Sequence, residues 1–205
     1  FFMEIAKLRA ARMVYAQIAE AYGASEAARK LHVFARTSAF TKTVYDPYVN
    51  ILRTTTEAFS GVVGGVDAME VAPLDEPFGS SEELTRRIAR NIQVMMQEEF
   101  HLTQPVDPAG GSWYVETLTA QLAESIWAYF QNIESKGGIE SAILSGALQD
   151  DVAATLAQRF KNLDTRTDRA VGVNMYANVL EQKLDRPAAK AVPAPAGPAV
   201  ITAKP

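Results

Sequence analysis

One stretch of the sequence guides the interpretation of the rest, Asp107-Pro108-Ala109-Gly110-Gly111-Ser112-Trp113-Tyr114-Val115-Glu116. Its Pro and paired Gly residues predict a turn. The four residues after the glycines, 112–115, predict a short strand or an extended turn. Two mostly apolar segments upstream, residues 31–35 and 67–72, have the length of short buried strands. The sequence therefore predicts three short strands that are far apart along the chain.

Helical segments lie between and after these strands. In them, apolar residues recur every three or four positions, which is typical of one helix face. The segments are residues 1–22, 46–63, 82–99 and 117–135, and more weakly 139–145 and 150–160. Strand and helix alternate in units of roughly 35–40 residues, the rhythm of a parallel α/β fold. Three strands alone would leave open sheet edges, so we expect the rest of the sheet to come from other polypeptide.

Two helices have features that the structure can test. Asp46 followed by Pro47 predicts a helix start, with Asp46 as the cap, because a Pro at the first helical position leaves no N–H unpaired. The periodicity also predicts which side chains face inward. These are Ile51, Leu52, Thr55, Phe59 and Val62 in the first of the two helices, and Leu84, Ile88, Ile92 and Met95 in the second.

Composition excludes several classes of protein. The net charge is −4, with no run of basic residues, which argues against a nucleic-acid partner. No apolar run reaches the roughly 18–20 residues that cross a bilayer, so no membrane association is expected. The sequence has no cysteine, which excludes thiolate metal sites and fits a cytoplasmic location. Residues 185–205 are rich in Pro and Ala and predict a disordered linker.

Three further segments carry a resemblance to a known family. They are residues 46–58, with the sequence DPYVNILRTTTEA, residues 87–91, with RIARN, and Glu98-Glu99, and they precede the 107–116 stretch in the expected order. Together they resemble the cobalamin-dependent acyl-CoA mutases, of which methylmalonyl-CoA mutase is the best known. The resemblance implies that residues 1–138 form the C-terminal portion of a (β/α)8 TIM barrel. Residues 139–184 would be a helical extension, and 185–205 the linker to a cobalamin domain.

The departures from the family favour its small, non-catalytic subunit. Active subunits carry Gln-Thr-Ser-Gly-Trp after the first of these strands, where this chain has Arg36-Thr37-Ser38-Ala39-Phe40. After the next strand they read His-Thr-Asn, and Ala72 falls where that Asn would be. The Asp-x-His-x-x-Gly motif, whose His ligates cobalt, is missing. We therefore assign no catalytic residue and no metal ligand to this chain.

The resemblance places three residues next to adenosylcobalamin. Glu76 matches the carboxylate that touches the adenosyl group in active relatives, and Ala39 and Gly79 match positions that face the corrin. A structural interpretation stays open for each of them. Asp75 and Glu76 could instead cap the following helix or lie in a solvated loop, and Ala39 and Gly79 could simply be small loop residues.

Three hypotheses about function follow. In the first, the chain is part of the small supporting subunit of a methylmalonyl-CoA mutase-like enzyme. Such a holoenzyme uses an adenosyl radical to interconvert (R)-methylmalonyl-CoA and succinyl-CoA. Its partner would be a mutase large subunit or the missing half of the barrel, with the acyl-CoA as substrate. In the second, the chain is a fragment of a catalytic subunit that acts on another branched acyl-CoA. In the third, it is a non-enzymatic assembly module.

Overall fold

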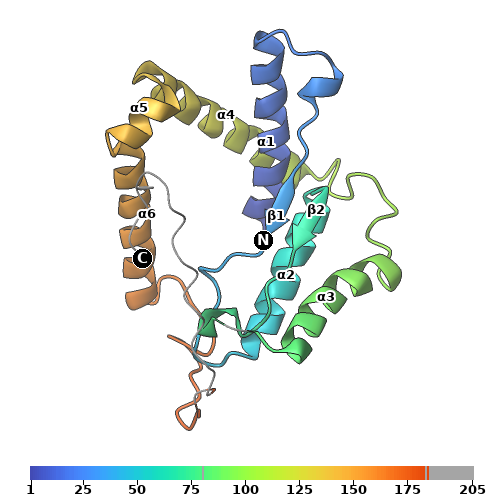
Figure 1. Ribbon diagram of the computed structural model, residues 1–205, viewed down its shortest axis with the longest axis vertical. Coiled ribbons are helices and arrows are strands. Elements are labelled where there is room, and N and C mark those ends of the chain that lie inside the picture. The colour runs from blue at the N-terminus through green and yellow to red at the C-terminus, as the bar shows by residue number, and fades with distance from the viewer. Residues whose placement is uncertain (80, 183, 185–205) are drawn as a thin grey trace.

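The computed structural model describes residues 1–79, 81–182 and 184. Helices and short strands alternate in its first half, and helices alone follow in its second half (Figure 1). The elements are α1 (Phe2–Ala21), η1 (Ala27–Arg29), β1 (Phe34–Arg36), α2 (Val49–Val63), β2 (Ala68–Glu70), η2 (Glu76–Phe78), α3 (Glu83–Glu98), α4 (Trp113–Ser135), α5 (Gly138–Leu144) and α6 (Ala147–Asp164). This order confirms the predicted α/β class.

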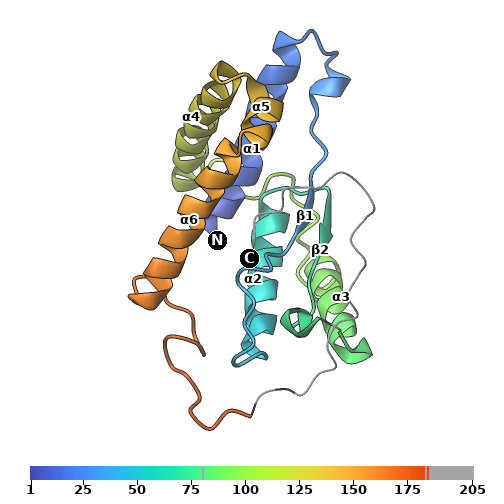
Figure 2. The same ribbon diagram turned by 60° about the vertical axis from the view of Figure 1, so that its left-hand side comes forward.

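The two strands form a parallel sheet, in which Phe34 lies opposite Ala68 and Arg36 lies opposite Glu70. Among the described residues this sheet has no third strand, so both of its outer edges are open. Helices α2 and α3 cover one face of it (Figure 2). There Met69 packs against a core cluster made of Ala58, Val71, Ala89, Ile92 and Met96. The opposite face carries Arg36 and Glu70 and is exposed.

The 107–116 stretch attaches α4 to α1. Arg9 on α1 forms ion pairs with both Asp107 and Glu116, and its NH2 group lies 2.7 Å from the Glu116 carboxylate. Between the same elements, the side chains of Ile5, Ala109 and Val115 form a second core cluster. The motif is therefore a docking element between two helices.

Two local predictions are wrong. Residues 112–115 do not form a strand, because the Ser112 hydroxyl accepts a hydrogen bond from the Val115 amide (3.5 Å) and caps α4, which begins at Trp113. Asp46 does not cap α2, which begins three residues later. Its backbone is left-handed (φ 45°), and its amide instead donates to the Glu181 carboxylate at 2.5 Å. That contact spans most of the chain, so the local sequence could not indicate it.

The helical extension turns away from α4 at two adjacent glycines. Gly137 and Gly138 have φ values of 97° and 81°, a backbone region that other residues rarely adopt. Helices α5 and α6 follow, close to the predicted 139–145 and 150–160, and α6 stands apart from the sheet (Figure 2). The predicted linker, 185–205, lies outside the described residues. In the described part of the chain, no helix combines the length and the apolar character that crossing a membrane requires.

Candidate functional site

The candidate site lies at the carboxyl ends of β1 and β2, where parallel α/β folds place their ligands. Arg36, the last residue of β1, donates a hydrogen bond to Glu70, the last residue of β2, over 3.0 Å. The same guanidinium also pairs with Glu76 in η2. These hydrogen bonds raise the pKa of Arg36 above its already high ordinary value, so its positive charge is permanent.

Glu76 is therefore only partly available to a ligand. One carboxylate oxygen pairs with Arg36, while the other, Oε2, is buried and has no hydrogen-bond partner among the described residues. A buried carboxylate oxygen without a donor is energetically costly. Oδ1 of the neighbouring Asp75 is in the same state, so two buried carboxylate oxygens without a donor in the described part of the chain lie side by side in the sequence at this site.

The other two predicted site residues lie in nearby loops. Ala39 is exposed in the loop that follows β1, and Gly79 is exposed directly after η2. Gly79 has a φ of 94°, so it serves a turn that a residue with a side chain would strain. Nothing in this geometry tests a contact of either residue with a cofactor, and their assignment stays a prediction.

Asp75 binds the start of α3. Its carboxylate oxygen Oδ2 accepts hydrogen bonds from the Glu82 amide (3.1 Å) and from the Thr85 hydroxyl (3.0 Å) at the start of α3. The residue is completely buried. Asp75 thus ties the loop after β2 to the next helix, which confirms the capping interpretation for this residue of the pair.

The loop after β1 is fastened to α2 by a buried cation. The Lys42 ammonium lies 2.7 Å from the Glu57 carboxylate and 2.8 Å from the Ser38 carbonyl oxygen, and the Lys42 side chain is fully buried. Glu57 also accepts a hydrogen bond from the Ser38 amide at 3.1 Å. Sequence analysis missed this pair, because a lysine in a loop normally indicates a solvated side chain.

Asn50 joins the two strand-end loops. Its side-chain amide donates to the carbonyl oxygens of Thr43 (2.8 Å) and Leu74 (2.9 Å), one in each loop. Its side-chain oxygen accepts from Arg53 at 2.7 Å. Asn50 is completely buried, and through it the 46–58 segment positions both loops of the candidate site.

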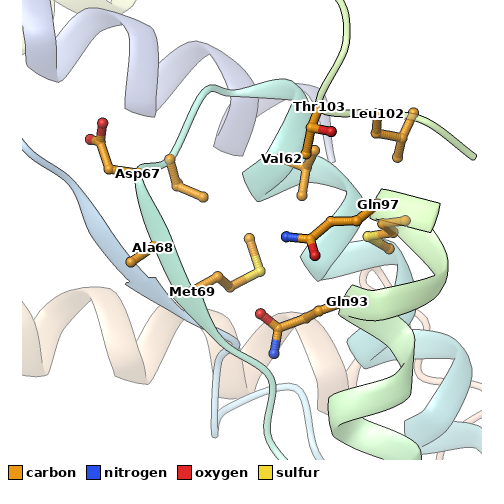
Figure 3. A pocket seen from close by; sticks show the side chains of 10 residues that line it. Val62, Asp67, Ala68, Met69, Gln93, Gln97, Leu102 and Thr103 are labelled. Carbon is orange, nitrogen blue, oxygen red and sulfur yellow. The ribbon is translucent and has the colours of Figure 1, made fainter.

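A pocket beside the sheet lies away from these strand ends. It has a volume of about 300 Å³ and opens between α2 and α3 at the amino end of β2 (Figure 3). Val62, Met69 and Leu102 line it, with the amides of Gln93 and Gln97 pointing into it. Because ligands of parallel α/β folds bind at the carboxyl ends of the strands, we do not assign the site to this pocket.

Comparison with known proteins agrees with the resemblance. The family model described as methylmalonyl-CoA mutase matches residues 1–193. The chain belongs to the methylmalonyl-CoA mutase family. It is 44% identical over 193 residues to the methylmalonyl-CoA mutase small subunit of Streptomyces virginiae, covering 94% of this chain and 31% of that protein. It is 41% identical over 189 residues to the small subunit of Porphyromonas gingivalis, covering 91% and 30%.

A further relative, whose name mentions no subunit, has a similar sequence identity. The methylmalonyl-CoA mutase of Cereibacter sphaeroides is 39% identical over 186 residues, which cover 90% of this chain and 26% of that protein. The chain thus spans between a quarter and a third of the length of these mutase-family relatives.

Proposed function

We propose that this chain is the C-terminal portion of the (β/α)8 barrel, with its helical extension, of a mutase small subunit. The complete heterodimer would interconvert (R)-methylmalonyl-CoA and succinyl-CoA in the cytoplasm, with adenosylcobalamin as the family's cofactor. The proposal rests on the family membership and on similarity to proteins named small subunits. The observation that carries the supporting role is Arg36, which already neutralises the carboxylate expected to face the cofactor.

Completion of a barrel is supported by apolar side chains that the described residues leave exposed. Leu52 on α2 and Leu84 on α3 are 66% and 62% exposed, and Met95 is 39% exposed. All three belong to the helix faces that periodicity predicts to be inward. Further strands and helices of a completed barrel would bury such apolar side chains.

The described residues fit only part of a cofactor site. Glu76 Oε2 is an unpaired acceptor, but Ala72 offers no polar side chain, and the Phe40 ring is in contact with α6. We therefore infer that the partner subunit holds the adenosylcobalamin, and we route no chemical step through this chain.

The test is an adenosylcobalamin titration of the full-length protein, alone and with a mutase large subunit, followed by absorbance. We expect no spectral change and no conversion of (R)-methylmalonyl-CoA for this protein alone, and both for the pair. A spectral change with this protein alone would overturn the supporting role.

The unpaired oxygen of Glu76 favours the alternative function, a catalytic subunit for another branched acyl-CoA. The variant E76Q distinguishes the two functions, with E70Q as its matched control because Glu70 pairs with the same arginine. For a supporting subunit, neither substitution changes cofactor affinity in the heterodimer. A loss of affinity with E76Q alone would favour the catalytic alternative.

A further inference from the structure

One contact of the helical extension with the candidate site involves an aromatic side chain of the loop after β1. Phe40 follows Ala39 in this loop, and its ring contacts two consecutive residues of α6. The Arg159 guanidinium carbon is 5.2 Å from the centre of the Phe40 ring, and the Phe160 ring is centred 6.1 Å away. The first distance is that of a cation–π contact, and the second is that of an aromatic pair.

The loop is held from two sides. From α2, Glu57 accepts hydrogen bonds from the Ser38 amide and from Lys42, which fix the loop backbone. From α6, Arg159 and Phe160 contact the Phe40 side chain. The α2 side fixes where the loop runs, and the α6 side fixes where its ring lies.

Helix α6 packs only weakly against the rest of the protein, so its contact with Phe40 is one of the few that hold it in place. In the described part of the chain, none of its residues is buried. The coil after α6 returns to the start of α2, where the Val171 carbonyl oxygen accepts a hydrogen bond from Arg53 (2.5 Å). The extension is therefore tied to the loop after β1 at Phe40 and to α2 at Val171.

We propose that Arg159 and Phe160 are positioning residues for the loop after β1. By holding the Phe40 ring they set the place of Ala39 at the carboxyl end of the sheet. The helical extension then controls the shape of this face without touching a ligand. The loop-positioning role stands on contacts within this chain, and only its effect on turnover rests on the proposed mutase function.

The test is hydrogen–deuterium exchange of the full-length protein, read on a peptide that covers residues 37–45. The variant R159Q removes the cation, R159K keeps it, and R169Q is the matched control, since Arg169 is exposed on the same extension. With R159Q we expect exchange of the loop amides to be about two- to fivefold faster, the factor for losing one exposed cation–π contact. R159K and R169Q should exchange like the wild type.

Turnover of the complete heterodimer gives the second measurement. We expect R159Q to lower kcat with KM unchanged, and R159K to restore it. If loop exchange is the same in R159Q and wild type, or is equally fast in R159K, the positioning role is overturned. If the exchange result holds and the heterodimer has no mutase activity, the positioning role stands and the proposed function fails.

Discussion

At the scale of single residues, the conformation of the loop after β1 depends on a buried ion pair. Lys42 has its hydrogen-bonding partners in Glu57, Ser38 and Thr41, and its side chain is fully buried. Removing one partner of a buried ion pair leaves the other without compensation, which costs more than the pair itself contributes. Loss of the Lys42 ammonium should therefore lower the stability of the protein more than loss of both charges.

The substitution K42M should destabilise the full-length protein by about 1–3 kcal/mol, because it leaves the Glu57 carboxylate partly buried and short of a donor. The double variant K42M/E57Q should recover part of that loss. Denaturant unfolding measures both. The control is K7M, which breaks the exposed pair of Lys7 with Glu4 and should have no measurable effect. Equal stability of K42M and wild type would contradict the role given to this cation.

The sequence indicated part of the site and could not have indicated the rest. Glu76, Ala39 and Gly79 came from the resemblance. The pairing of Arg36 with both Glu70 and Glu76 depends on the register of the sheet, since those partners are 34 and 40 residues away. No local pattern reports a register between distant strands.

At the scale of elements, the positions of the helices were predictable, but their inward faces only partly so. Ile92 on α3 is buried and Val62 on α2 packs against the core, both as predicted. The predicted face of α2 contained Leu52, which is exposed, whereas Asn50, Thr54 and Ala58 are buried. Periodicity identifies an apolar stripe without saying which neighbour covers it. Most buried positions of α2 are small or polar, and Gly61 lies close to Met69 of β2, whereas Leu52 and Phe59 are exposed.

The docking of α4 on α1 should depend on pH. The hydrogen bond from the Gly111 amide, and then that from Arg9, lower the pKa of Glu116 below its ordinary value of 4.5. A carboxyl group whose pKa is lowered by folding contributes stability above its unfolded pKa. That contribution is lost as the pH falls through the lower folded value. We therefore expect E116Q to be less stable than wild type at neutral pH and to match it in acid.

The measurement is the denaturant midpoint of the full-length protein across the acid range, from about pH 3 to pH 7. E124Q is the control, because Glu124 is exposed on the same helix. A constant difference between E116Q and wild type at every pH would rule out the pair as the source of the acid sensitivity.

At the scale of the whole molecule, the open sheet predicts that exposed apolar side chains become buried in the complete protein. L84K should destabilise the full-length protein by about 1.5–3 kcal/mol, the value of burying one leucine side chain. R87Q, exposed on the same helix, should have little effect. Thermal unfolding gives the comparison. Equal stability of L84K and wild type would mean that Leu84 faces water in the complete protein, and burial of this face of α3 by further barrel elements would be wrong.

The hydrogen bond between Arg53 and Val171 joins residues 118 positions apart. A contact of such long range closes a long loop, and the entropy of closing it slows folding. During synthesis the ribosome completes α2, the sheet and all of α4 before it makes Val171. The hydrogen bond at the start of α2 can therefore form only after nearly all of the described chain has been synthesised. A protein that ends after α5 would lack this hydrogen bond.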